Sequence, residues 1–193
     1  MERLNSVRDF EAWRKKLLVA VDPKALLVMV CGGTGCTALG STEVYEAFET
    51  EIQKLGLSGK VRLKRTGCHG FCEKGPVVVL LPEQFFYPGI EPEDVPELIE
   101  KSVLKKEPVE RLLYIDPASG RKITYEYEVP FYAKQQRNVF RNNGRIDPVD
   151  ITDYVRRDGY TAFVRTLKEY SPGQVIEIVT ASGLRGRGVL HRL

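Results

Sequence analysis

The chain has 193 residues, which is long enough to bury a sizeable core. Hydrophobic residues make up 42% of it and charged residues 28%, as in an ordinary globular protein. The formal net charge of +3 is too small to indicate a nucleic-acid-binding protein. The longest apolar runs, Ala25–Cys31 and Val77–Leu81, are far shorter than the ~20 residues of a membrane-spanning helix. We therefore expect no nucleic-acid partner and no membrane insertion.

The N-terminus and the four cysteines together indicate the compartment. The first twenty residues interleave charged and apolar side chains, so they lack the apolar centre of a secretory signal peptide. We therefore expect a cytoplasmic protein, whose thiols are kept reduced. In that setting, four cysteines more often bind a metal or take part in catalysis than form disulfides.

The hydrophobic pattern predicts an α/β domain in the first half of the chain. Residues 5–20 have the pattern of an amphipathic helix, with Phe10, Trp13 and Leu17 on one face. The elements predicted after it are a strand at 25–30, a helix at 42–55, strands at 60–65, 76–81 and 84–87, and a helix at 93–104. The order β-α-β-β-β-α is typical of an α/β domain on a small mixed sheet.

The second half of the chain has shorter and weaker patterns. Residues 112–127 predict a β-hairpin around Pro117-Ala-Ser-Gly120, and Asp147-Pro148 is typical of a helix start. Two more short helices are expected at 161–170 and 172–181, and a mobile tail after about residue 182. The expected division of the chain is an N-terminal helix (1–23), an α/β domain (24–105), a linker with the hairpin (106–128) and a small α+β C-terminal region (129–193).

The cysteines form two closely spaced pairs. Four residues separate Cys31 from Cys36, three separate Cys68 from Cys72, and 31 lie between the pairs. Both pairs lie in glycine-rich segments beside predicted strand ends, where the backbone can approach the sulfurs closely. A 2Fe–2S cluster needs four thiolates and nearby N–H donors. A structural zinc site accepts four thiolates at similar spacings, so the pattern leaves both metals open.

His69 lies inside the second cysteine pair and is a further candidate ligand. Rieske clusters replace two cysteines with two histidines. The other histidine of this chain, His191, lies in the irregular tail, and four cysteines already complete a ligand set. We therefore expect His69 to lie beside the ligands or at the surface rather than to bind the metal.

Two motifs carry a family resemblance. They are Cys31-Gly-Gly-Thr-Gly-Cys36 after a strand, and Gly67-Cys68-His69-Gly70-Phe71-Cys72 before Gly75-Pro76 and another strand. With them, residues 24–105 resemble the thioredoxin-like 2Fe–2S ferredoxins, which include the 24-kDa-type subunit of respiratory complex I and its hydrogenase relatives. The resemblance implies a thioredoxin-like α/β fold and a 2Fe–2S cluster whose ligands are Cys31, Cys36, Cys68 and Cys72.

Residues 129–188 resemble the start of the flavin- and NADH-binding (51-kDa-type) subunit of NADH dehydrogenases and NAD-linked hydrogenases. The stretches that carry this resemblance are Ala133-Lys-Gln-Gln-Arg137, Asn143-Gly-Arg-Ile-Asp-Pro148, Gly159-Tyr160 and Ala181-Ser-Gly-Leu-Arg-Gly-Arg-Gly188. In that family the last stretch continues into the glycine-rich loop that holds the FMN phosphate and then into the NADH-binding domain. This sequence reads Gly186-Arg-Gly-Val-Leu-His-Arg-Leu193 there, so we expect it to bind neither FMN nor NAD.

Together these observations predict an electron-transfer protein. Its expected function is to relay single electrons through a 2Fe–2S cluster in a complex of the NADH dehydrogenase or NAD-linked hydrogenase type. The expected partners are the flavoprotein and iron–sulfur subunits of that complex, and the chain itself is expected to be a non-catalytic module. A zinc-stabilised structural or interaction module is the alternative.

Overall fold

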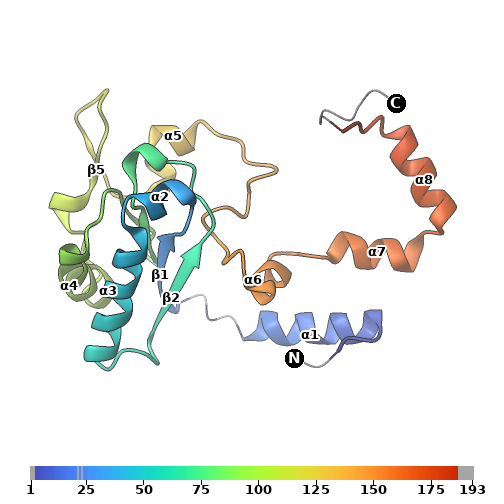
Figure 1. Cartoon of the computed structure of the whole chain (residues 1–193), viewed down its shortest axis with the longest axis horizontal. Helices are drawn as coiled ribbons and strands as arrows, with labels where there is room; N and C mark the ends of the chain where they lie inside the picture. The colour runs from blue at the N-terminus through green and yellow to red at the C-terminus, as the bar shows by residue number, and fades with distance from the viewer. Residues whose placement is uncertain (1–2, 21, 23, 187–193) are drawn as a thin grey trace. The chain divides into compact units, whose positions relative to one another are not determined.

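A computed structural model of the chain describes residues 3–20, 22 and 24–186 (Figure 1). Its contacts divide the chain into two compact units, residues 20–154 and residues 1–19 with 155–193. The four cysteines and all the strands found in the described residues lie in the first unit.

A four-stranded mixed sheet forms the centre of the first unit. In spatial order its strands are β2 (Val61–Thr66), β1 (Leu26–Cys31), β3 (Val78–Leu81) and β4 (Phe85–Tyr87). β1 and β2 are parallel, with Cys31 opposite Thr66 at their last residues. β3 is antiparallel to β1, and β4 is antiparallel to β3. The carboxyl ends of β1 and β2 therefore lie next to each other at one end of the sheet.

Helices connect and cover these strands. The connection from β1 to β2 contains α2 (Thr34–Ala38) and α3 (Ser41–Lys54). A continuous helical segment follows β4 and changes from a 3₁₀ turn (Pro92–Asp94) through α4 (Val95–Glu97) to a π-helical stretch (Leu98–Leu104). Side chains of α3 and of this later segment pack into the same buried cluster, so both lie on one face of the sheet.

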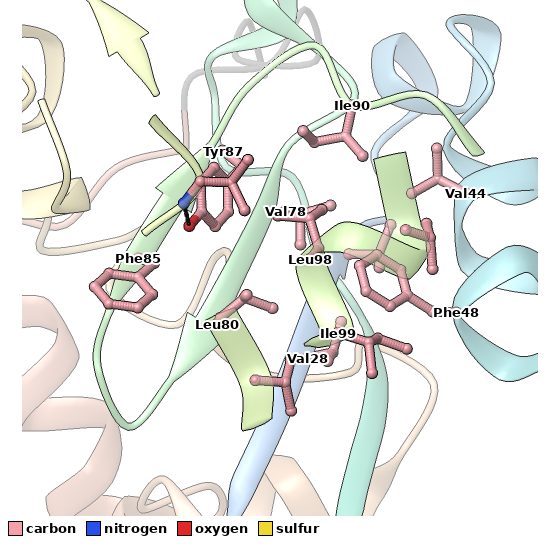
Figure 2. Close-up of a cluster of buried hydrophobic side chains, with 14 of the residues drawn as sticks. Val28, Val44, Phe48, Val78, Leu80, Phe85, Tyr87, Ile90, Leu98 and Ile99 are labelled. Atoms are coloured by element: carbon pink, nitrogen blue, oxygen red, sulfur yellow. Dashed lines mark hydrogen bonds between the residues drawn. The ribbon is translucent and has the colours of Figure 1, made fainter. Parts of the chain in front are cut away.

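Side chains that alternate along β1 divide the core in two. Val28 and Val30 belong to the buried cluster that α3 and α4 cover (Figure 2). Met29 and Cys31 belong to a separate buried cluster, which also holds Phe71. Because successive side chains of a strand point to opposite faces, the last residue of β1 places its thiol on the face away from α3.

The chain after Leu104 contributes to both clusters: Val109 and Leu113 are buried with α3, and later residues pack on the second face. Its elements are a 3₁₀ turn (Glu110–Leu112), β5 (Tyr114–Ile115), β6 (Lys122–Ile123), a second 3₁₀ turn (Glu126–Glu128) and α5 (Pro130–Ala133). β5 and β6 form an antiparallel hairpin. Tyr114 and Val129 are buried in the same cluster as Met29 and Cys31.

The second unit is helical. Its helices are α1 (Val7–Val19), α7 (Thr161–Glu169) and α8 (Pro172–Ala181), and α6 (Ile151–Arg156) lies at the division between the units. Ion pairs join Arg14 to Asp158 and Glu11 to Lys168, so residues far apart in the sequence meet in this unit.

The predicted elements and the mixed α/β sheet are largely confirmed. One difference concerns residues 31–36, where the sequence predicts a loop but α2 begins at Thr34. Gly33 and Gly35 give no helical signal because glycine is a poor helix former. The turn forms because Cys36 packs into the buried cluster on the second face of the sheet. A second difference is that the helix expected from Asp147 begins at Ile151.

Other predictions fall partly outside these observations. The mobile tail expected after residue 182 concerns mainly residues 187–193, which lie outside the described residues. Among the residues that are described, no helix combines the length and the apolar character needed to cross a membrane. The domain boundaries at 23, 105 and 128 stay predictions.

Tyr87 links the core to the chain that follows the helical segment. Its ring is fully buried, and its hydroxyl lies 2.7 Å from the Ser102 hydroxyl. The same hydroxyl accepts the N–H of Val109 at 3.0 Å (Figure 2). Ser102 donates in turn to the carbonyl of Glu107. The hydroxyl of Tyr87 therefore accepts a hydrogen bond from the buried N–H of Val109, which lies beyond the end of the helical segment.

We expect Tyr87→Phe to lower the free energy of unfolding by about 1–3 kcal/mol, because it leaves the buried N–H of Val109 without its acceptor. Tyr127→Phe is the matched control, since Tyr127 is 57% exposed, and it should change that free energy by less than ~0.5 kcal/mol. Urea denaturation followed by circular dichroism measures both. Equal values for the two variants would contradict the role given to the Tyr87 hydroxyl.

Candidate metal centre

The parallel strands bring the two cysteine loops together. Cys31 is the last residue of β1, and the loop with Cys68 and Cys72 follows Thr66, the last residue of β2. Because the carboxyl ends of neighbouring parallel strands lie at the same edge of a sheet, both loops start there. The N–H of Gly32 donates to the carbonyl of Thr66 at 2.8 Å and ties one loop to the other.

Two glycines allow the loops to approach closely. A Cβ atom added to Gly33 would lie 2.9 Å from the Cβ atom of Cys68. One added to Gly35 would lie 3.0 Å from the Cβ atom of Cys72. The first distance is shorter than real Cβ atoms adopt, and the second is at the lower limit of what they adopt. A larger residue at Gly33 would therefore push the two loops apart, and one at Gly35 would crowd them.

The four thiols form two pairs. The Sγ atoms of Cys68 and Cys72 are 3.8 Å apart, and the thiols of Cys31 and Cys36 interact with each other. Two thiolates on one tetrahedral metal, with metal–sulfur bonds of about 2.3 Å, lie ~3.8 Å apart. Within the described residues, no three His, Cys, Asp or Glu side chains are grouped around a single metal position. Pairs of thiols fit a 2Fe–2S cluster, in which each iron takes two protein ligands.

Backbone N–H groups point at the sulfurs. The N–H of Gly70 donates to the Sγ atom of Cys68 at 3.2 Å. The other N–H donors are Gly33 and His69, which donate to Cys31, and Val77, which donates to Cys36. Donors of this kind stabilise negative charge on sulfur and tune the potential of an iron–sulfur cluster.

The hydrogen bond between the two buried thiols separates their pKa values. The bond from Cys36 lowers the pKa of Cys31 to about 5, and the N–H donors add to this effect against the cost of burial. The same bond, together with burial, raises the pKa of Cys36. Burial also raises the pKa of Cys68. Cys31 is therefore predisposed to the thiolate form, which is the form that binds a metal.

The site is buried on one side and open on the other. The side chains of Cys31 and Cys36 are 0% and 1% exposed, whereas Cys68 is half-buried and Cys72 is exposed. The second pair of thiols therefore faces solvent, and this is the side from which another protein can approach the site.

His69 is buried rather than at the surface. Its side chain is 1% exposed, so the alternative prediction, that His69 lies at the surface, is wrong. Its Nε2 atom lies 3.2 Å from the Thr66 hydroxyl, and its Nδ1 atom lies 3.1 Å from Oε1 of Glu126. Both ring nitrogens thus have protein partners, which agrees with a role beside the cysteines instead of as a ligand.

Glu126 connects His69 to an arginine further along the chain. The Oε2 atom of Glu126 lies 2.7 Å from the Arg145 guanidinium. Burial by itself raises the pKa of Glu126, but His69 and Arg145 outweigh that effect and hold the pKa below its usual value. The carboxylate therefore stays charged while it orients the imidazole of His69.

Residues 126–147, here named the wrapping segment, pack around the loop that carries Cys68 and Cys72. Besides the Glu126–His69 contact, the N–H of Gly67 donates to the Ile146 carbonyl at 3.1 Å. The rings of Phe71 and Phe131 stack with centroids 4.8 Å apart. The second cysteine loop is therefore held between the end of β2 and a segment that lies far along the chain.

The sequence patterns do not predict that four residues of the wrapping segment meet this loop: Glu126, Arg137, Gly144 and Arg145. Glu126 and Arg137 contact His69 from 57 and 68 positions away. Asn143-Gly144 is a recognisable turn signal, but nothing in a turn signal shows which residue lies under it. Only the folded chain brings these residues to the site.

Comparisons with known proteins agree with this geometry. The family model described as thioredoxin-like [2Fe-2S] ferredoxin matches residues 20–103. A 2Fe-2S ferredoxin of Clostridium pasteurianum is 38% identical over 77 residues, which cover 40% of this chain and 76% of that protein. Two subunits of the NADP-reducing hydrogenase of Solidesulfovibrio fructosivorans also match. HndB is 28% identical over 121 residues (58% of this chain, 95% of HndB), and HndC is 46% identical over 55 residues (28% of this chain, 11% of HndC).

We expect Gly144→Ala to destabilise the protein more than Gly120→Ala does. Both glycines have a positive φ, +71° and +68°, so both substitutions carry the backbone strain of about 1–2 kcal/mol. At Gly144 the new Cβ atom would also lie 2.7 Å from the His69 ring, whereas nothing lies within 4 Å at Gly120. This overpacking should add about 1–3 kcal/mol, measured by urea denaturation. Equal losses at both positions would mean that the His69 ring is not confined there.

Proposed function

Because the chain belongs to the thioredoxin-like [2Fe-2S] ferredoxin family, we propose that it transfers electrons within an NAD(P)-linked hydrogenase or NADH dehydrogenase type of complex. A 2Fe–2S cluster is its cofactor, and the proposed ligands are Cys31, Cys36, Cys68 and Cys72. The observation that carries the ligand set is the meeting of two thiol pairs at the ends of β1 and β2.

The chain's own residues supply three things to such a cofactor, which itself provides the one-electron chemistry. The four thiols bind it, two from each loop. The backbone N–H groups of Gly33, His69, Gly70 and Val77 hold negative charge on the sulfurs. The buried cluster around Met29 and Phe71 excludes water from the inner side, while Cys72 leaves the outer side open.

The proposed setting in a larger redox complex rests on two relatives. HndB and HndC are named as subunits of one NADP-reducing hydrogenase, and this chain is similar to both. The similarity supports a multi-subunit redox complex, and the partners that we propose in it are its flavoprotein and iron–sulfur subunits. That the C-terminal region corresponds to the start of a 51-kDa-type flavin subunit stays a proposal, which rests on the sequence motifs of residues 129–188.

Two further expectations stay predictions. They are the cytoplasmic location and the absence of FMN and NAD binding. The zinc-stabilised module is not proposed, because no observation on the described residues favours zinc over the family's own cofactor.

The first test is the composition of the protein after anaerobic purification. We expect a brown protein with about two iron and two sulfide per chain. A colourless protein with about one zinc, which anaerobic reconstitution with iron and sulfide fails to colour, would sink the proposal. Visible absorption and metal analysis on one sample decide between them.

We expect Cys36→Ser and Cys72→Ser each to lose most of the iron, because a serine oxygen is a poorer ligand than a thiolate for iron in such clusters. Glu73→Ser is the matched control. Its side chain is 76% exposed, and it follows Cys72 directly, so it should retain the wild-type iron content. Iron and sulfide analysis with visible circular dichroism measures the three variants. Wild-type cluster content in either cysteine variant would remove that residue from the ligand set.

A further inference from the structure

One peptide group lies between Cys68 and an arginine of the wrapping segment. Its N–H belongs to Gly70 and donates to the Sγ atom of Cys68 at 3.2 Å. Its carbonyl belongs to His69 and accepts a hydrogen bond from Nη2 of Arg137 at 2.9 Å. The two ends of the same amide are therefore bound by a proposed ligand sulfur and by a permanent positive charge.

Gly70 gives the amide this orientation. Its φ is +86°, a conformation that other residues rarely adopt. A Cβ atom at this position would also point toward Nη2 of Arg137, at 3.7 Å. A residue other than glycine would therefore strain this turn, although its Cβ atom would fit beside the guanidinium.

Arg137 is held in place by its own neighbours. Its guanidinium lies over the ring of Tyr132, 4.8 Å from the centroid, and its Nε atom donates to Oε1 of Gln135 at 2.9 Å. The side chain is half-buried. A guanidinium that is both stacked and hydrogen-bonded keeps a fixed orientation, whereas a freely rotating surface side chain does not.

We propose that Arg137 is a positioning residue that raises the reduction potential of the cluster by acting through the 69–70 amide. A cation on the carbonyl polarises the peptide group, and hydrogen bonds in a chain strengthen one another. The N–H of Gly70 then stabilises negative charge on the Cys68 sulfur more strongly. Reduction adds one negative charge to the cluster, so a stronger donor favours the reduced form. The inference rests on the proposed ligand set.

Arg137 lies outside the segment that matches the ferredoxin family, which ends at residue 103. Arg137 belongs to the wrapping segment, so a part of the chain added to the ferredoxin domain sets the properties of its site. This separates the role of Arg137 from that of the four cysteines and of the loop glycines.

The test compares three variants of the full chain with the wild type. Arg137→Gln removes the charge, and Arg137→Lys keeps the charge but loses the planar group that stacks and bonds at once. Arg141→Gln is the matched control, because Arg141 is an exposed arginine of the same segment. Iron and sulfide are measured first, and the reduction potential follows from a dye-mediated titration monitored by electron paramagnetic resonance.

We expect Arg137→Gln to keep its cluster and to lower the ratio of reduced to oxidised protein at a fixed potential, on the order of two- to tenfold. A tenfold change corresponds to about 59 mV for a one-electron couple. Arg137→Lys should shift in the same direction by less, and Arg141→Gln should not shift. Salt at ~0.5 M screens exposed charges, so the difference between Arg137→Gln and the wild type should persist in it.

Three results would overturn the inference and leave the proposed function intact. They are an unchanged potential in Arg137→Gln with full cluster content, an equal shift in Arg141→Gln, or a wild-type potential in Arg137→Lys. If Arg137→Gln loses its iron, the reduction potential of Arg137→Lys alone decides whether the inference holds. A wild-type protein without iron contradicts the proposed function itself, so the two failures are distinguishable.

Discussion

The arrangement of the site depends on the close approach of two loops at the carboxyl ends of β1 and β2. Parallel pairing brings Cys31 level with Thr66, and the bond from Gly32 to Thr66 holds the loops at that distance. The approach leaves no room for a Cβ atom at Gly33 and very little at Gly35. Backbone hydrogen bonding and the absence of side chains at these glycines therefore set how closely the two cysteine loops approach.

The second loop depends on a partner that lies outside the ferredoxin domain. Thr66 and Glu126 hold the two ring nitrogens of the buried His69, and Arg145 keeps Glu126 charged. A buried histidine without partners would cost free energy, so this network makes a polar side chain compatible with the core. The wrapping segment is thereby part of the site and more than a linker to later residues.

Electrostatics and exposure give the site a direction. The inner pair of thiols is buried and surrounded by N–H donors from Gly33, His69 and Val77. The outer pair faces solvent beside Phe131, whose ring is 38% exposed and stacked on Phe71. An electron-transfer site needs a protected interior and one accessible side, because transfer requires a partner to come close without exposing all of the cofactor to water.

The sequence by itself determined the order of the elements and the set of candidate thiols. Apolar periodicity and glycine-rich loops are local patterns, so the α/β arrangement and the two cysteine pairs could be read directly. Tertiary structure decided which groups surround those thiols. The α2 turn forms because packing outweighs the poor helix propensity of glycine. The contacts that bury His69 come from Glu126 and Arg137, which lie 57 and 68 positions further along the chain. Such contacts leave no periodic signal in the sequence, because they depend on the path of the chain and not on the spacing of its residues.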